Sequence, residues 1–139
     1  MGRPEPLGRG SRGVPGAGET PGKLGAEAET LAARHLAGNG YRVLDRNWRA
    51  GRRELDLVVR RGEVVAFVEV KARGPGPQDP REALNRKKRR EVRRAAEAWI
   101  HLHPGVGREF RFDVVAVRAR AGRPVELEHI PNAFFGEDC

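Results

Sequence analysis

The strongest hydrophobic pattern lies in residues 54–71, where two apolar, β-branched runs flank the dipeptide Arg61-Gly62. This arrangement predicts a β-hairpin. A two-residue turn at Arg61-Gly62 sets Arg60 opposite Glu63 and, further along, Glu54 opposite Glu69. Because side chains alternate along a strand, the hairpin has one wholly apolar face and one face that mixes apolar and charged residues.

The two faces of this hairpin differ in chemistry. The apolar face must be buried, and it consists of Leu55, Leu57, Val59, Val64, Ala66, Val68 and Val70. The mixed face carries three carboxylates and an ammonium at the end away from the turn, and it consists of Glu54, Asp56, Val58, Val65, Phe67, Glu69 and Lys71. Like charges facing each other across a sheet cost about 0.2–1 kcal/mol per pair, and a divalent cation would reverse that effect. The spacing alone leaves two interpretations open: a metal site, or a hydrated strand end in which Lys71 neutralises Glu69.

The remaining pattern predicts two helices and three further strands. Residues 24–37 carry an apolar stripe at helical spacing and end at Gly38-Asn39-Gly40. Strands are expected at 41–47, 110–117 and 124–130, with a basic connection at 48–53 and a loop at 74–80. The second helix is expected at 81–102, with an apolar face of Leu84, Val92, Ala95, Trp99 and Leu102. A hairpin followed by a helical crossover predicts an α/β fold with a mixed sheet flanked by helices.

Composition and charge narrow the function classes. The 139 residues suit one domain, predicted at 23–135, between a Gly-, Pro- and Arg-rich segment at 1–22 that is expected to be disordered and a tail at 136–139. The net charge of +8 favours a polyanionic partner, nucleic acid rather than a membrane. The single cysteine, Cys139, rules out an internal disulfide. No apolar run resembles a membrane span or signal peptide, so a cytoplasmic protein is expected.

Basic residues gather in two places. On the second helix, the run from Arg86 to Arg94 has only Glu91 as a counter-charge, which favours phosphate contact over a merely solvated face. The expected contacts there are Lys88, which lies on the inward face, and Arg89, Arg90, Arg93 and Arg94. A second group, Arg49, Arg52 and Arg53, lies beside Trp48, which could stack on a base or cover the edge of the core.

Three further polar residues are interpreted as structural. His101 and His103 straddle the end of the second helix, and no other ligand cluster lies near them in the sequence. Asp113 is a lone acid in an apolar strand, so a buried, hydrogen-bonded role is expected for it.

Asp56, followed by Glu69-Val70-Lys71 at the end of the next strand, resembles the D…ExK core of restriction-endonuclease-like nucleases. More narrowly, the chain resembles the bacterial YraN family, whose members are similar to archaeal Holliday junction resolvases. Ala28 and Arg53 depart from the family pattern, which has glycine at both positions. The resemblance runs from about Gly25 to Phe135, and it is carried by Ala28-Glu29, Gly40–Leu44, Arg46–Arg49, Glu54–Leu57, Phe67–Lys71, Lys88, Arg111–Val115 and His129–Phe134.

The resemblance implies an αβββαβ core and a metal-dependent nuclease. Asp56 and Glu69 would hold Mg²⁺ or Mn²⁺, Glu29 and Glu54 would complete the ligand set, and Lys71 would orient the attacking water or meet the departing charge. The resemblance favours DNA over RNA, suggests branched DNA as a substrate, and leaves a homodimer open. The alternative is a nucleic-acid-binding module that keeps the fold and the basic helix but does not cleave.

Overall fold

The computed structural model describes residues 21–73, 86–118 and 122–133. The loop at 74–80, the helix start at 81–85, the tail at 136–139 and residues 1–20 of the segment predicted to be disordered lie outside this part of the chain. The prediction of disorder is wrong for residues 21 and 22, because a helix begins at Pro21. The elements are, in order, α2 (Pro21–Gly38), β1 (Arg42–Ala50), β2 (Arg53–Arg61), β3 (Val64–Arg73), α3 (Arg86–Leu102), β4 (Glu109–Arg118) and β5 (Glu126–Ile130).

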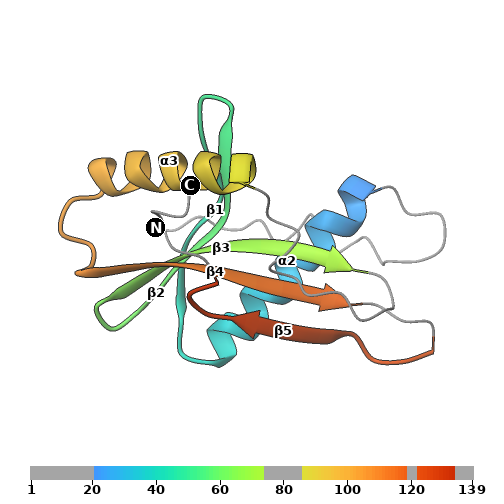
Figure 1. Cartoon of the computed structure of the whole chain (residues 1–139). Coiled ribbons are helices and arrows are strands. Elements are labelled where there is room, and N and C mark those ends of the chain that lie inside the picture. The colour runs from blue at the N-terminus through green and yellow to red at the C-terminus, as the bar shows by residue number, and fades with distance from the viewer. Residues whose placement is uncertain (1–20, 74–85, 119–121, 134–139) are drawn as a thin grey trace.

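The five strands form one mixed sheet in the order β1-β2-β3-β4-β5. Only β3 and β4 run parallel, and α3 makes the crossover between them. Helices α2 and α3 lie on opposite faces of the sheet (Figure 1). This arrangement confirms the predicted α/β fold, with its αβββαβ core and a mixed sheet flanked by helices. Neither helix in the described residues is long and apolar enough to cross a membrane.

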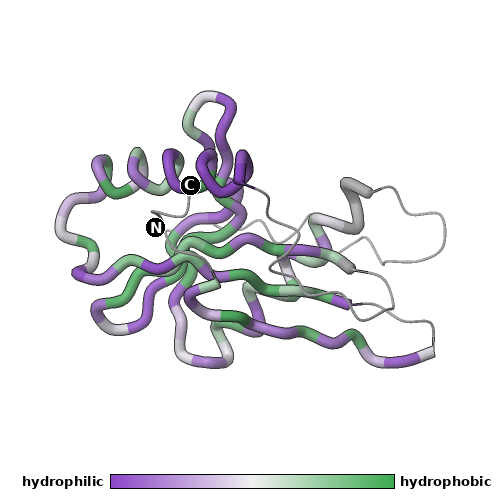
Figure 2. Tube along the Cα trace, viewed as in Figure 1, coloured by the Kyte–Doolittle hydropathy of each residue, from purple (hydrophilic) through white to green (hydrophobic). Residues whose placement is uncertain are grey.

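The sheet separates two apolar clusters, and Figure 2 shows its central strands as largely hydrophobic. Fully burying a large apolar side chain contributes about 1.5–3 kcal/mol, so these clusters hold the helices against the sheet. The α2-side cluster contains Ala28, Ala32, Ala33, Leu36, Tyr41, Leu57, Val59, Ala66, Val68, Val115 and Val117. The α3-side cluster contains Leu55, Val58, Val65, Phe67, Val92, Ala95, Ala96, Trp99 and Val114.

The turn of the β2–β3 hairpin lies one residue later than predicted. Gly62 and Glu63 form it, Arg61 pairs with Val64, and the ladder continues as far as Leu57 with Val68. Gly62 has a φ of 64°, so glycine takes the first turn position, where a Cβ would be strained. The predicted pairing of Glu54 with Glu69 is therefore wrong. Each β2 residue pairs with a β3 residue two positions later than predicted. Because side chains alternate every residue, a shift of two keeps each side chain on its predicted face, and Leu55 is the one exception.

The predicted basic connection at 48–53 is instead the tip of a second hairpin. Strands β1 and β2 pair from Arg42 with Arg60 to Ala50 with Arg53, and Gly51 turns the chain at a φ of 64°. This two-stranded β1–β2 ribbon passes α3 and projects beyond it (Figure 1). Leu55 and Trp48 contact the α3-side cluster, so Leu55 is not on the face predicted for it and Trp48 covers the core edge.

The inward face of α3 is as predicted except at its end. Val92, Ala95 and Trp99 are buried, whereas Leu102 is 63% exposed. The ring of His103 stacks on Trp99 with 4.0 Å between centroids, and its Nδ1 lies 2.7 Å from the Trp99 carbonyl oxygen. Trp99 also donates a hydrogen bond to Asp45 at 2.7 Å. His103 thus finishes the packing of the helix, in agreement with its structural interpretation.

Candidate active site

The predicted site residues gather where β2 and β3 part. The pairing of these strands ends at Leu57 with Val68. Just beyond that point, the Asp56 carboxylate accepts a hydrogen bond of 2.9 Å from the backbone N–H of Val70. Buried backbone donors need an acceptor, and here a side chain supplies it. The Asp56 carboxylate is therefore held in place at the opening between the two strands.

Glu69 is buried beside this opening, with 5% of its surface exposed. Two ammonium groups approach the same carboxylate oxygen: Nζ of Lys71 and Nζ of Lys88 each lie 3.6 Å from Oε2. Lys71 belongs to the same strand as Glu69, and Lys88 reaches it from α3. The structure thus brings together Asp56, Glu69 and Lys71 and adds Lys88, which the helical spacing had placed on the inward face.

Asn47 connects the two remaining predicted carboxylates. Its Nδ2 donates a hydrogen bond of 2.7 Å to Oε1 of Glu29 and a longer one of 3.4 Å to Oε2 of Glu54. Glu54 also lies 3.6 Å from Nη2 of Arg49. The sequence interpretation assigned no role to Asn47. The available signal was an asparagine, which tolerates left-handed backbone, at the end of a predicted strand.

The electrostatics of the site disfavour negative charge. Burial is the main reason that the pKa of Glu69 rises from 4.5 to about 7, and the nearby charge of Asp56 adds to this rise against the opposing effect of Lys88 and Lys71. Burial also raises the pKa of Asp56, although the hydrogen bond from Val70 opposes it. Bringing a cation to such carboxylates favours their ionised forms.

Glu29 shares this environment. Burial raises its pKa from 4.5 to about 7, the hydrogen bond from Asn47 opposes the rise, and the charges of Asp56 and Glu54 add to it. The carboxylates of α2, β2 and β3 are therefore close enough to influence one another's ionisation.

The donor chemistry fits Mg²⁺ or Mn²⁺, both of which prefer carboxylate oxygens. Among the described residues, no three Asp, Glu, His or Cys side chains are placed to hold one metal ion together. The four predicted ligands, Asp56, Glu69, Glu29 and Glu54, therefore lie in one region but do not form a complete coordination site. The pair that fits is Asp56 and Glu69, because Mg²⁺ is commonly bound through one or two carboxylates while waters and substrate phosphates complete its shell.

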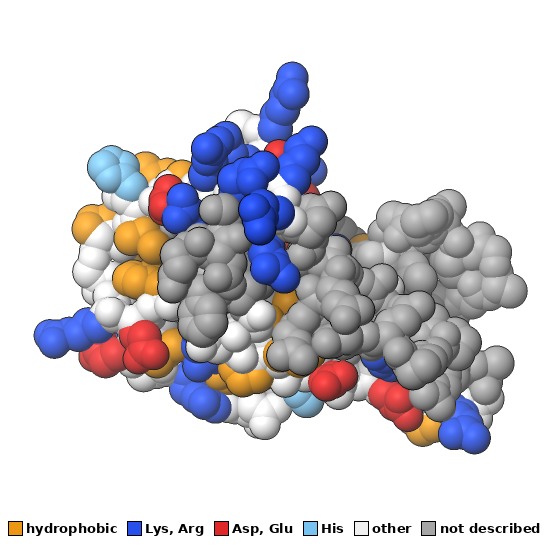
Figure 3. Space-filling model, viewed as in Figure 1, with side chains coloured by type: hydrophobic (Ala, Val, Ile, Leu, Met, Phe, Trp, Pro, Cys, Tyr) orange, Lys and Arg blue, Asp and Glu red, His pale blue; other side chains and the backbone are white. Residues whose placement is uncertain are grey.

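The predicted nucleic-acid contacts lie on two elements that border this site. Lys88 of α3 and Arg49 of the β1–β2 ribbon each contact one of the site carboxylates. Figure 3 shows Lys and Arg side chains gathered over this part of the surface. On α3, Arg90 and Arg94 are exposed and Arg89 and Arg93 are half-buried, while on the ribbon Arg49 and Arg52 are exposed and Arg53 is half-buried.

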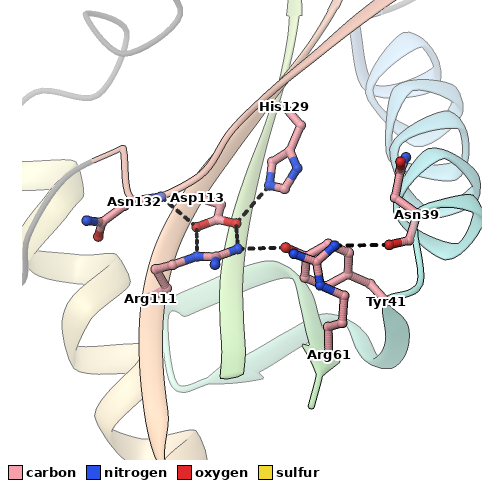
Figure 4. Close-up of polar contacts among 7 residues, drawn as sticks. All are labelled: Asn39, Tyr41, Arg61, Arg111, Asp113, His129 and Asn132. Atoms are coloured by element: carbon pink, nitrogen blue, oxygen red, sulfur yellow. Dashed lines mark hydrogen bonds and ion pairs between the residues drawn. The ribbon is translucent and has the colours of Figure 1, made fainter. Parts of the chain in front are cut away.

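A second buried acid lies on the other side of the sheet. Asp113 is fully buried and accepts hydrogen bonds from Nε and Nη2 of Arg111 at 3.0 and 2.8 Å and from the Asn132 backbone N–H at 2.9 Å (Figure 4). Nε2 of His129 lies 2.8 Å from its Oδ2, and Arg111 also donates to the Tyr41 hydroxyl at 2.8 Å. Burial alone would raise the pKa of Asp113, but these hydrogen bonds outweigh it and lower the pKa below 3.8. The predicted buried, hydrogen-bonded role of Asp113 is confirmed.

Comparison with known proteins identifies the family. The profile of the uncharacterised protein family UPF0102 matches residues 28–117. A UPF0102 protein of Anaeromyxobacter dehalogenans is 48% identical over 126 residues, which cover 90% of this chain and 93% of that protein. UPF0102 proteins of Chlorobaculum tepidum and Frankia casuarinae are 43% and 46% identical over 83% and 80% of this chain, and 94% and 95% of their own lengths are covered. The chain therefore belongs to UPF0102, the family to which the YraN resemblance pointed.

Proposed function

We propose that this protein is a metal-dependent nuclease that hydrolyses phosphodiester bonds, with DNA as its expected substrate and the cytoplasm as its place of action. The observation that carries the proposal is the pair of the half-buried Asp56 and the buried Glu69, with the ammonium groups of Lys71 and Lys88 against Glu69 and two basic elements at its border. Carboxylates that suit a divalent cation, nearby ammonium groups and a basic surface together support phosphodiester hydrolysis.

The energetic cost of this arrangement supports a functional role. Two neighbouring carboxylates whose pKa values are raised by burial weaken the folded state when they ionise. A divalent cation offsets that cost, since it adds two positive charges next to both groups. Pairs of titratable groups perturbed in this way are concentrated at functional sites.

Each side chain has a distinct expected role. A bound divalent ion would supply an acidified water and charge neutralisation at the phosphate. Asp56, held by the Val70 N–H, and Glu69 would bind the ion, with Glu29 and Glu54 supporting them. Lys71 would orient the water or stabilise the charge that develops on the departing oxygen. Lys88, which lies against Glu69, would add a positive charge for the phosphate where the basic surface of α3 meets the site.

The second candidate is a nucleic-acid-binding module without catalysis. One observation favours it: both Lys71 and Lys88 lie 3.6 Å from Oε2 of Glu69, so its charge is partly compensated by the protein alone. Such a protein binds through the same basic elements and needs no metal.

The decisive experiment measures cleavage and metal binding together. Four-way junctions, duplexes, single-stranded DNA and RNA are incubated with the purified protein in Mg²⁺, Mn²⁺ or chelator, and Mn²⁺ binding is titrated by calorimetry. We expect metal-dependent cleavage that falls by about 100-fold or more in Asp56→Asn and Glu69→Gln. Asp56→Ala should abolish Mn²⁺ binding. Glu128→Gln, at an exposed acid of β5, is the matched control.

The outcome also separates the two candidates. Nucleic-acid binding with no cleavage in either metal, and no Mn²⁺ binding, would establish the binding module instead. Cleavage that persists in both acid variants would place the activity elsewhere or in a contaminant. Gel filtration of the same preparation with and without a junction tests whether the protein acts as a homodimer.

A further inference from the structure

Asn47 has a backbone conformation that is uncommon inside a β-strand. Its φ is 50°, although it lies within β1. Asparagine enters this left-handed region more readily than most residues, but the conformation is still strained, and such residues are concentrated at functional sites.

The left-handed residue coincides with a change in the direction of the β1–β2 ribbon. Arg46, just before it, donates a hydrogen bond of 3.1 Å to Thr30 of α2, whereas Trp48, just after it, contacts the α3-side cluster. On the partner strand, Leu57 and Leu55 divide between the two clusters in the same way. Residues two apart on a regular strand share a face, so the ribbon twists sharply at Asn47.

The twist places the amide of Asn47 between two carboxylates from different elements. Nδ2 carries two hydrogens, which allows it to donate to both Glu29 of α2 at 2.7 Å and Glu54 of β2 at 3.4 Å. The amide is neutral. It can therefore hold the two carboxylates together without adding a positive charge that would compete with a divalent cation.

We infer that Asn47 is a positioning residue for the acidic site: its left-handed backbone and its amide fix Glu29 of α2 and Glu54 of β2 beside Asp56. This inference rests on the proposed function for its consequence, because the fixed carboxylates then support the metal ligands. Residues that orient ligands in this way typically contribute about 10- to 100-fold to metal affinity.

The test uses a variant that keeps the backbone and removes the amide. In Asn47→Gly, glycine adopts the positive φ without strain, so the side-chain hydrogen bonds are lost while the backbone conformation is kept. Asn132→Gly is the matched control, because Asn132 also has a positive φ, 55°, and lies in the segment that follows β5. Calorimetry with Mn²⁺ should show binding about 10- to 100-fold weaker in Asn47→Gly and unchanged in Asn132→Gly.

A double-mutant cycle shows whether Asn47 acts through Glu29. In a Glu29→Met background, which removes the closer acceptor of the Asn47 amide, Asn47→Gly should weaken Mn²⁺ binding only slightly further. Wild-type affinity in Asn47→Gly, or an equal loss in both backgrounds, would overturn the inference and leave the proposed function standing.

The same cycle separates this inference from a failure of the proposed function. If the wild-type protein binds no Mn²⁺, the nuclease proposal fails, and the cycle is then measured by urea unfolding without metal at pH 8.5. Non-additive effects of Asn47→Gly and Glu29→Met on the unfolding midpoint would still establish that Asn47 positions Glu29. Additive effects would overturn it.

Discussion

Asp113 and Glu69 are both buried acids in the middle of the sheet, yet their surroundings differ. They lie at successive positions of the β3–β4 ladder, where Val68 pairs with Asp113 and Glu69 pairs with Val114. Asp113 accepts hydrogen bonds from rigid partners, namely a guanidinium and a backbone N–H, and its pKa is lowered. Glu69 has two lysines at 3.6 Å, and its pKa is raised to about 7.

The partners of the two acids also differ in distance and exposure. The Lys71 and Lys88 side chains are 24% and 40% exposed, and their distances to Glu69 exceed that of a direct hydrogen bond. Arg111 is instead tied to both Asp113 and Tyr41, so it joins β4 to the start of β1 (Figure 4). The Asp113 network is a structural lock, whereas the proposed function requires the Glu69 site, called the open site below, to exchange its lysine contacts for a metal ion.

The largest expected effect is a loss of folding stability when the Asp113 network is broken. Asp113→Ala leaves Arg111 and His129 without their acceptor in the interior, and breaking a buried charged network costs about 3–5 kcal/mol. Urea unfolding at pH 7.5 measures this loss. Glu128→Ala, at an exposed position of β5, should stay within about 0.5 kcal/mol of the wild type. A loss below about 1 kcal/mol in Asp113→Ala would contradict the lock.

The next effect concerns catalysis at the open site. An ammonium beside the reacting phosphate matters most when charge develops, so Lys71→Met should reduce cleavage by about 10²- to 10³-fold while sparing most nucleic-acid affinity. Methionine keeps the length and the apolar stem, so the strand should fold. Single-turnover cleavage and fluorescence anisotropy on the same DNA measure the two quantities. Undiminished cleavage would make Lys88 the next lysine to test.

A smaller effect is expected for Glu69, where removing the charge should stabilise the protein, in contrast to the loss expected for Asp113→Ala. The folded-state pKa of Glu69 lies above its ordinary value of 4.5, so ionising it costs stability as the pH rises from about 4.5 through 7. Glu69→Gln removes that cost and should stabilise the protein by about 1–3 kcal/mol at pH 8, with little gain at pH 4.5. Urea unfolding across this pH range checks the trend, and a gain independent of pH would contradict it.

Asp113 should show the reverse dependence. Its folded-state pKa is lowered from 3.8, so its contribution is fully present above that value and is lost as the pH falls further. The stability difference between wild type and Asp113→Ala should therefore shrink in acid, whereas the difference between wild type and Glu69→Gln grows towards alkaline pH. If the stability differences of both variants changed with pH in the same direction, Asp113 and Glu69 would not differ in the way proposed.

The smallest effect per residue is expected on the basic surface. Replacing Arg89, Arg90, Arg93 and Arg94 with glutamine should lower the salt slope of log K for duplex DNA by about 0.9 for each phosphate that these arginines neutralise. The matched variant replaces Arg49, Arg52 and Arg53 on the β1–β2 ribbon. A slope that changes only in the ribbon variant would transfer the main binding surface from α3 to the ribbon.

Local periodicity was enough to predict much of the site. Alternation along β2 and β3 placed Asp56, Glu69 and Lys71 on one face, and helical spacing turned Lys88 towards them. It did not reveal the register, because turns at Arg61-Gly62 and Gly62-Glu63 put the same side chains on each face, and the positive φ of Gly62 goes with the later turn. The arginines at the ribbon tip likewise have the composition of a loop, although they lie on paired strands.

The sequence by itself therefore determined the order of elements, the faces of the central hairpin and the acids that share a face, since these depend on backbone geometry repeated every two or 3.6 residues. Only the tertiary structure decided what each acid meets. Asp113 meets His129 from β5 and Arg111, and Arg111 in turn donates to the Tyr41 hydroxyl. The amide of Asn47 donates to Glu29, which lies 18 residues earlier in the chain. Whether a buried carboxylate becomes a lock or an open site depends on donors supplied by distant segments, and chain folding alone brings them together.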